Sequence, residues 1–246
     1  MFPYHDENDT QRTPIVTMAI IAANVLAWLF VQGAGAEFPL TASVCNLGLI
    51  PGELTLSVRP GTGFPMGDGV ACLMDPGRQT PHVLTSMFLH GSWMHLLGNM
   101  WFLWLFGNNV EDAMTRGHFV VFYLACGLAA ALLQVVANPA SMIPMVGASG
   151  AISGVMGAYL LLFPRVRVMT LVVLGFFITR TALPAWVMLG YWAFIQFASG
   201  LTTVNVEGGG VAFWAHVGGF AAGLVLAAAF RRTNYLATQR WKNPEP

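Results

Sequence analysis

Charged residues are scarce in this sequence. Asp, Glu, Lys and Arg together make up 9% of the 246 residues, whereas hydrophobic residues make up 56% and the mean hydropathy is +0.62. Soluble globular domains carry about 25% charged residues, so this composition excludes an ordinary soluble domain. The sequence predicts an integral membrane protein.

Acidic residues are rarest in the middle of the chain. Between Pro81 and Arg232 the only ones are Glu111, Asp112 and Glu207. An aspartyl protease that works inside a membrane needs two buried carboxyl groups, so the sequence excludes that class. Nucleotide, metal and redox motifs are absent as well, and we expect no cofactor and no nucleic-acid partner.

The histidines do not form a metal-binding motif. His90 and His95 are five residues apart, which is not the HExxH spacing of zinc hydrolases. No carboxylate is expected at the depth of His216, the third histidine that a metal site could use. We therefore predict no metal site.

Six segments are nearly free of charge, and each approaches the roughly 20 residues that a helix needs to cross a bilayer. Residues 166–179 are shorter and carry Arg167 near their start, so we interpret them as an interfacial segment. The sequence predicts one all-α membrane domain over residues 1–246, with six transmembrane helices. These are residues 15–31, 93–110, 119–137, 145–163, 182–198 and 211–230.

The basic residues predict the orientation of these helices. With both termini in the cytoplasm, only Arg59 and Arg78 fall outside. The remaining nine fall inside, and cytoplasmic loops carry such an excess of Lys and Arg. They are Arg12, Arg116, Arg165, Arg167, Arg180, Arg231, Arg232, Arg240 and Lys242.

A long loop, residues 33–92, joins the first two predicted helices on the outer side. It is too long to be a simple connection, and its Gly, Pro and apolar clusters suit short amphipathic helices at the membrane surface. Cys45 and Cys72 lie in this loop, where a disulfide and two free thiols are equally compatible with the sequence. Cys126 lies in a predicted helix, where we expect it to pack.

Polar side chains from three distant segments fall at one depth, below the outer surface. His95 and Asn99 are four residues apart and share a face at the outer end of one helix. Ser149 and His216 begin two other helices that run in the same direction. Ionisable groups inside a membrane are functional by default.

Glycines predict that the helices of Ser149 and His216 pack closely. Gly150 and Gly154 are four residues apart on one helix, and Gly219 and Gly223 are four apart on the other. This spacing of small residues allows two membrane helices to approach backbone to backbone. Close packing would bring the Ser149 hydroxyl within reach of His216, as a serine nucleophile and its base require.

A third catalytic group cannot be found among the acids. Glu111 lies about 24 Å along its helix from His95, near the inner face, and Glu207 lies in an outer loop. The pattern therefore predicts a Ser–His dyad. Glu111 and Asp112 are expected to cap contacts at the inner face, with Arg116 or with neighbouring backbone.

Donors for a developing oxyanion are also present. The Ser149 N–H stands at a helix start, where the first N–H groups have no internal partner. His95 and Asn99 are the natural side-chain donors, and we assign Gly147 to the same binding region.

Three motifs together resemble the rhomboid intramembrane serine proteases of bacterial type. They are Gly147-Ala148-Ser149-Gly150, the His95-xxx-Asn99 pair and Ala215-His216-xx-Gly219-xxx-Gly223, within residues of about 80 to 230. The resemblance implies a six-helix rhomboid bundle, N-in and C-in, with the first outer loop partly embedded in the membrane.

The resemblance also implies a function. Ser149 would be the nucleophile and His216 the base, and His95 with Asn99 would line the oxyanion hole. The substrates would be transmembrane segments of membrane proteins, cleaved in the bilayer near its outer face, and the protein would reside in the cell (inner) membrane. The alternative is a catalytically inactive rhomboid-like protein that binds membrane clients.

One position departs from the pattern of some family members. These have a tyrosine four residues after the nucleophile, which packs on the catalytic histidine, whereas this sequence has Ser153. The orientation of His216 must therefore come from another group.

Overall fold

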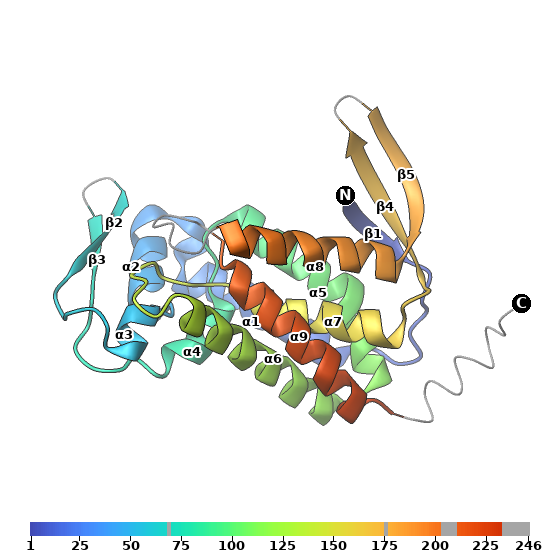
Figure 1. Cartoon of the computed structure of the whole chain (residues 1–246), viewed down its shortest axis with the longest axis horizontal. Coiled ribbons are helices and arrows are strands. Elements are labelled where there is room, and N and C mark those ends of the chain that lie inside the picture. The colour runs from blue at the N-terminus through green and yellow to red at the C-terminus, as the bar shows by residue number, and fades with distance from the viewer. Residues whose placement is uncertain (68–69, 175–176, 203–210, 233–246) are drawn as a thin grey trace, which may run out of the picture.

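Helices make up most of the computed structural model, which describes residues 1–67, 70–174, 177–202 and 211–232. A helix covers most of each of the six apolar segments, and three of the helices extend beyond them (Figure 1). The helices of these segments are α1 (Ile15–Leu26), continued by the π-helical turn η1 (Ala27–Val31), α5 (Trp93–Ala113), α6 (Arg116–Ala137), α7 (Ser149–Leu162), α8 (Ala185–Thr202) and α9 (Phe213–Phe230). Glu207, Arg240 and Lys242 lie outside the described residues.

Within the described ranges, two helices are long and apolar enough to cross a membrane by length and composition. These are α6 and α9, and the stretches Ile15–Val31 and Ser149–Leu162 are apolar but shorter.

Helix α7 lies at the centre of the bundle and packs on α5, α6, α8 and α9. Its contact with α9 is a glycine seam, formed by Gly150, Gly154, Gly219 and Gly223. A methyl group added to Gly219 would overlap the carbonyl of Gly150, and one on Gly223 would overlap the carbonyl of Gly154. The two backbones therefore touch directly, as the glycine spacing predicts.

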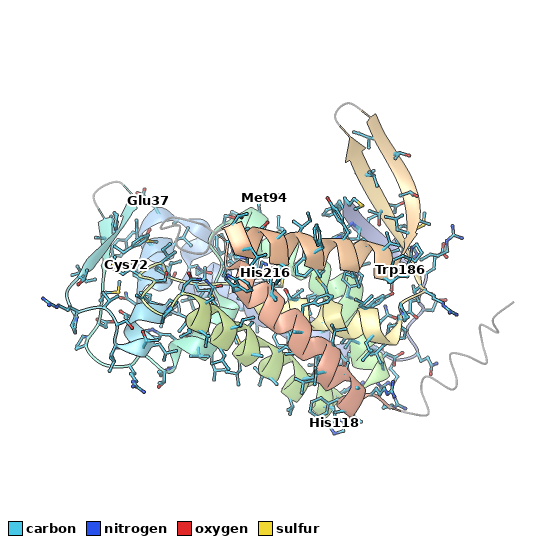
Figure 2. The ribbon with its side chains drawn as sticks, in the orientation of Figure 1. Glu37, Cys72, Met94, His118, Trp186 and His216 are labelled. Atoms are coloured by element: carbon cyan, nitrogen blue, oxygen red, sulfur yellow. A yellow bond between two sulfur atoms is a disulfide. The ribbon has the colours of Figure 1, made fainter. Side chains whose placement is uncertain are left out.

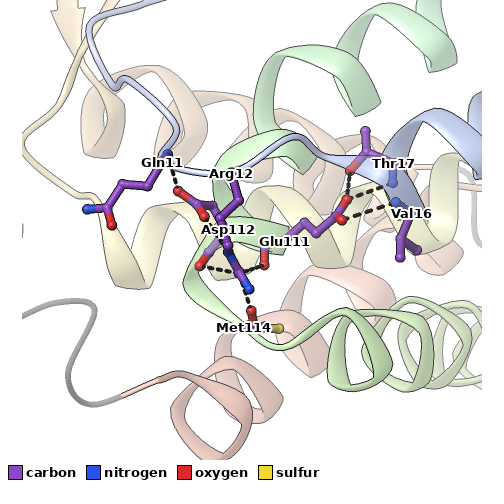
Figure 3. Close-up of polar contacts among 7 residues, drawn as sticks. All are labelled: Gln11, Arg12, Val16, Thr17, Glu111, Asp112 and Met114. Atoms are coloured by element: carbon purple, nitrogen blue, oxygen red, sulfur yellow. Dashed lines mark hydrogen bonds and ion pairs between the residues drawn. The ribbon is translucent and has the colours of Figure 1, made fainter.

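Glu111 caps the start of α1 from the last turn of α5 (Figure 3). Its carboxylate accepts hydrogen bonds from the N–H groups of Val16 and Thr17, at 3.0 and 2.7 Å, and from the Thr17 hydroxyl at 2.8 Å. The first N–H groups of a helix have no internal partners, and the helix dipole favours a negative charge there. The expected role of Glu111 in capping neighbouring backbone is confirmed.

Asp112 binds the segment that precedes α1. It accepts from the Arg12 guanidinium at 2.9 Å and from the Gln11 N–H at 2.6 Å. Arg12 also donates to three carbonyls at the end of α5, including that of Met114 at 2.7 Å (Figure 3). Within the described residues, the ionic partner of Asp112 is thus Arg12, and not the expected Arg116.

The expectation of an all-α fold is wrong at the end of the bundle opposite residues 33–92 (Figure 1). Strands β1 (Phe2–Asp6), β4 (Arg167–Leu174) and β5 (Phe177–Pro184) form an antiparallel sheet in the order β1-β4-β5. The expected interfacial segment 166–179 therefore contributes to a hairpin, which projects from the bundle in Figure 1. Its Val, Thr and Ile residues favour strands, and the hairpin delays the start of α8 to Ala185.

Strand β1 joins α5 to α7. The Trp101 indole of α5 donates to the Pro3 carbonyl at 2.8 Å. The Asp6 carboxyl group accepts from Asn109 of α5 at 2.9 Å and from the Tyr159 hydroxyl of α7. Burial raises the pKa of Asp6 to about 6.

The outer loop contains short helices and a second, two-stranded sheet. Its elements are η2 (Gly33–Gly35), α2 (Glu37–Leu47), α3 (Pro51–Thr55), β2 (Gly63–Gly67), β3 (Val70–Leu73), α4 (His82–Thr85) and η3 (Ser86–Phe88). A disulfide joins Cys45 of α2 to Cys72 of β3, with a Cα–Cα distance of 5.3 Å, which decides between the two alternatives left by the sequence. Cys126 is a buried free thiol.

The outer loop supports the segment that leads into α7. Leu49 and Met145 exchange two backbone hydrogen bonds, at 3.0 and 2.8 Å, and the Gly52 N–H donates to the Ser141 carbonyl at 2.9 Å. The Gly147 N–H donates to the Ser86 carbonyl at 2.8 Å. These bonds fix the backbone immediately before Ser149.

Gly223→Ala tests the importance of the glycine seam. The added methyl group meets backbone atoms of Gly154, which cannot rotate away, so we expect a loss of about 1–3 kcal/mol of unfolding free energy. Thermal unfolding of the detergent-purified protein would measure it. Gly190→Ala on α8 is the matched control, because its methyl group would meet open space. Equal melting temperatures for the two variants would contradict direct backbone contact.

Candidate active site

Ser149 and His216 are hydrogen-bonded to each other. Ser149 is the first residue of α7, and His216 lies in the first turn of α9. The distance between His216 Nε2 and Ser149 Oγ is 2.8 Å. Figure 2 shows His216 at the end of α9 that is nearer the outer-loop elements.

The glycine seam explains this short distance. It begins one residue after Ser149 and continues three residues after His216, so the backbone contact fixes the separation of the two helix starts. Gln134 of α6 adds a further bond, because its side-chain oxygen accepts from the Ala215 N–H at 3.2 Å. This bond satisfies one of the N–H groups at the start of α9.

Residues at the start of α5 orient the side chain of His95. Ser92 is the N-cap of α5 and accepts from the His95 N–H at 3.1 Å. The Gly91 N–H donates to His95 Nδ1 at 3.3 Å. Because Nδ1 accepts this bond, a neutral His95 carries its proton on Nε2.

Gly147 provides the space between His95 and Ser149. Its φ of +129° is one that residues with a side chain rarely adopt. A methyl group at this position would lie 2.9 Å from His95 Nε2 and 3.5 Å from Ser149 Oγ. Glycine is therefore required here by conformation and by space.

Asn99 lines the same space and carries an unpaired donor. The residue is 8% exposed, and its side-chain nitrogen is a buried atom with no hydrogen-bond partner among the described residues. It lines a cavity of about 500 Å³ together with Gly147, Ser149, His95 and His216. An unpaired buried donor costs about 1–3 kcal/mol, which a ligand oxygen in this cavity would offset.

The structure thus brings together all five residues that the sequence singled out. His90 has a structural role, because its backbone exchanges two hydrogen bonds of 2.7 Å with the Gln32 side chain. Its ring packs edge-on against that of His95, with centroids 5.1 Å apart. This contact restricts the movement of the His95 ring.

Sequence reasoning missed the group that contacts the other nitrogen of His216. Gln196 Oε1 of α8 lies 2.7 Å from His216 Nδ1. The sequence did carry a signal, since Gln196 is the one side-chain amide in the apolar segment 182–198. Polar residues at such positions form interhelical hydrogen bonds.

Metal binding has no structural support within the described ranges. No group of three or more His, Cys, Asp and Glu side chains there is arranged to hold a metal ion. The chemistry that this arrangement can perform is that of a serine nucleophile paired with a histidine base, next to donors for an oxyanion. Serine hydrolases have such sites.

Comparison with known proteins gives the family. Residues 77–233 match the Rhomboid domain, and the chain belongs to the Rhomboid domain family. This match includes both helices of the Ser149–His216 pair and the whole of α5.

Individual relatives agree with this assignment. The chain is 33% identical over 147 residues to rhomboid protease GluP of Bacillus subtilis, a match that covers 60% of this chain and 25% of GluP. It is 32% identical to rhomboid protein 1, mitochondrial, of Saccharomyces cerevisiae, over 37% of this chain and 27% of that protein. Rhomboid-like protein 11, chloroplastic, of Arabidopsis thaliana is 31% identical, over 58% and 50%. The chain therefore spans half or less of each relative's length.

Proposed function

We propose that this protein is an intramembrane serine endopeptidase that uses Ser149 and His216 as a catalytic dyad. The 2.8 Å hydrogen bond between Ser149 Oγ and His216 Nε2 is the observation that carries the proposal. Membership of a family that includes named proteases supports it. The substrates are transmembrane segments of other membrane proteins.

The geometry suggests how the reaction proceeds. Ser149 Oγ attacks the carbonyl carbon of the scissile peptide bond, and His216 Nε2 takes the hydroxyl proton. His216 then returns this proton to the leaving amine. In the second half of the reaction, His216 takes a proton from water as the water oxygen attacks the acyl carbon. The ester bond to Ser149 Oγ then breaks, and His216 returns the proton to Ser149 Oγ as the new carboxyl terminus leaves.

Three donors are placed to stabilise the oxyanion of each tetrahedral intermediate. They are His95 Nε2–H, the Asn99 side-chain amide and the Ser149 backbone N–H at the start of α7. His95, Asn99 and Ser149 all line the cavity of about 500 Å³. Donors held in place before the reaction lower its barrier without reorganisation.

We also propose that six helices cross the bilayer with both termini in the cytoplasm. Cytoplasmic placement of the β4–β5 hairpin agrees with Arg167 and Arg180 on that side. The disulfide of the outer loop agrees with an oxidising compartment on the opposite side. The active site then opens toward the extracytoplasmic side of the cell membrane, with the outer loop next to the outer leaflet.

Single-cysteine labelling tests this topology. The native cysteines do not react with maleimide, because Cys45 and Cys72 form a disulfide and Cys126 is buried. In intact spheroplasts of an expression host, an impermeant maleimide should label Thr80→Cys in the outer loop but not Thr179→Cys on β5. Both positions are exposed, and lysis should make the second reactive. Labelling of Thr179→Cys before lysis would overturn the orientation.

Covalent labelling with a fluorophosphonate tests the nucleophile. The detergent-purified protein should react, and Ser149→Ala should abolish the reaction because the attacking oxygen is gone. Ser153→Ala is the matched control, since the Ser153 hydroxyl donates to the Ser149 carbonyl and does not face His216. A catalytically inactive client-binding protein would remain unlabelled in wild-type form and would retain bound membrane proteins in every variant.

Removing one oxyanion donor tests the second half of the site. Asn99→Ala should lower kcat for a transmembrane substrate by about 10²- to 10³-fold while changing KM little, because the donor acts on charge that develops in the transition state. Asn99→Asp should lower kcat as far, since it keeps the shape but replaces the donor with an acceptor. A change confined to KM would assign Asn99 to substrate binding instead.

A further inference from the structure

The imidazole of His216 must be held in one tautomer and one orientation to act as a base. A neutral ring carries one proton, and Nε2 can accept the Ser149 proton only if that proton sits on Nδ1. The Nδ1–H group then needs an acceptor. Among the described residues, no carboxylate lines the cavity, and His95 is the one titratable side chain there besides His216.

Gln196 meets this requirement. Its Oε1 lies 2.7 Å from His216 Nδ1, on the opposite side of the ring from Ser149. With Oε1 as the acceptor, the proton is held on Nδ1 and Nε2 stays free to accept from Ser149 Oγ. The amide therefore fixes both the tautomer and the rotation of the ring.

A second residue of α8 holds the ring from its face. Trp192 precedes Gln196 by four residues, so the two side chains share one face of the helix. The centroids of the Trp192 and His216 rings are 5.9 Å apart, and the ring planes differ by 38°. Trp192 also packs on Phe220 of α9, with the same centroid distance.

This arrangement stands in place of the tyrosine found four residues after the nucleophile in some rhomboids. Ser153 occupies that position here, and its hydroxyl donates to the Ser149 carbonyl at 2.6 Å. The histidine is therefore held from α8 and not from the helix of the nucleophile.

We propose that Gln196 is the positioning residue of the dyad, which holds His216 in the tautomer and rotation that allow Nε2 to accept the Ser149 proton. This inference rests on the proposed protease function. An amide suits the task, because an unpaired carboxylate would be costly in an apolar segment whereas a neutral amide is not ionised. Gln196 touches neither substrate nor scissile bond, and it acts through His216.

The first test removes the acceptor while keeping much of the side-chain volume. Gln196→Leu should lower kcat about 10- to 100-fold with KM within about twofold, because the ring loses its orientation but the substrate site stays intact. The rate of fluorophosphonate labelling at Ser149 should fall by a similar factor. Ile195→Leu, one residue earlier on α8, is the matched control and should leave both rates unchanged.

The second test introduces a charge and measures the kcat–pH profile, which a merely structural role of Gln196 would leave unchanged. Gln196→Glu keeps an acceptor beside Nδ1 and adds a negative charge that favours the imidazolium form. It should restore part of the activity lost in Gln196→Leu, and it should move the acid limb of the kcat–pH profile to higher pH by about one unit or more. The shift arises because more alkaline solution is needed to deprotonate His216.

The outcomes separate this inference from the function on which it rests. Full kcat in Gln196→Leu, or an unmoved acid limb in Gln196→Glu, would overturn the positioning role while Ser149→Ala still abolishes labelling. Absence of labelling in the wild-type protein would refute the protease function itself. Thermal unfolding of each variant separates misfolding from a loss of orientation, because a misfolded variant would also melt at a lower temperature than Ile195→Leu.

Discussion

The direct contact between the backbones of α7 and α9 is the constraint on which the rest of the structure depends. Glycines on both helices remove the side chains that would hold the axes apart. The separation of the helices sets the 2.8 Å between Ser149 and His216, which sit at the same end of this contact. The remaining elements keep these two helix starts aligned and surround them with donors.

Polar interactions are divided between the two ends of the bundle. At the inner end, Glu111, Asp112 and Arg12 connect the last turn of α5 to the start of α1. At the outer end, the disulfide-bonded loop supports the backbone that enters α7. Between them the described helices pack mainly through apolar side chains, so the hydrogen-bonded groups of the site lie in an apolar surrounding.

Much of the fold could be predicted from composition and spacing alone. The apolar segments contain the long helices, and the paired glycines predicted the α7–α9 contact that the structure has. The three motifs identified the family, and the five singled-out residues line one cavity. These predictions succeed because they depend on residues close together in sequence or on a regular helical spacing.

Other features depend on how distant segments meet, and the sequence could not decide them. The strands of residues 167–184 were not foreseen, because a short apolar run suits a strand as well as an interfacial segment. The Cys45–Cys72 bond depends on the fold of the whole outer loop. The contact of Gln196 with His216 depends on the rotation of α8 about its axis, which only packing against α9 determines.

The glycine seam also determines which changes this protein can tolerate. In most protein cores the harmful substitutions remove atoms and leave cavities. Along α7 and α9 the opposite holds, because Gly219 and Gly223 already contact carbonyl groups and have no atoms to lose. Substitution by alanine shortens side chains elsewhere, but at these two glycines it adds a methyl group. Natural variants that damage this contact should therefore be those that replace one of these glycines by a larger residue, although the glycines carry no catalytic group.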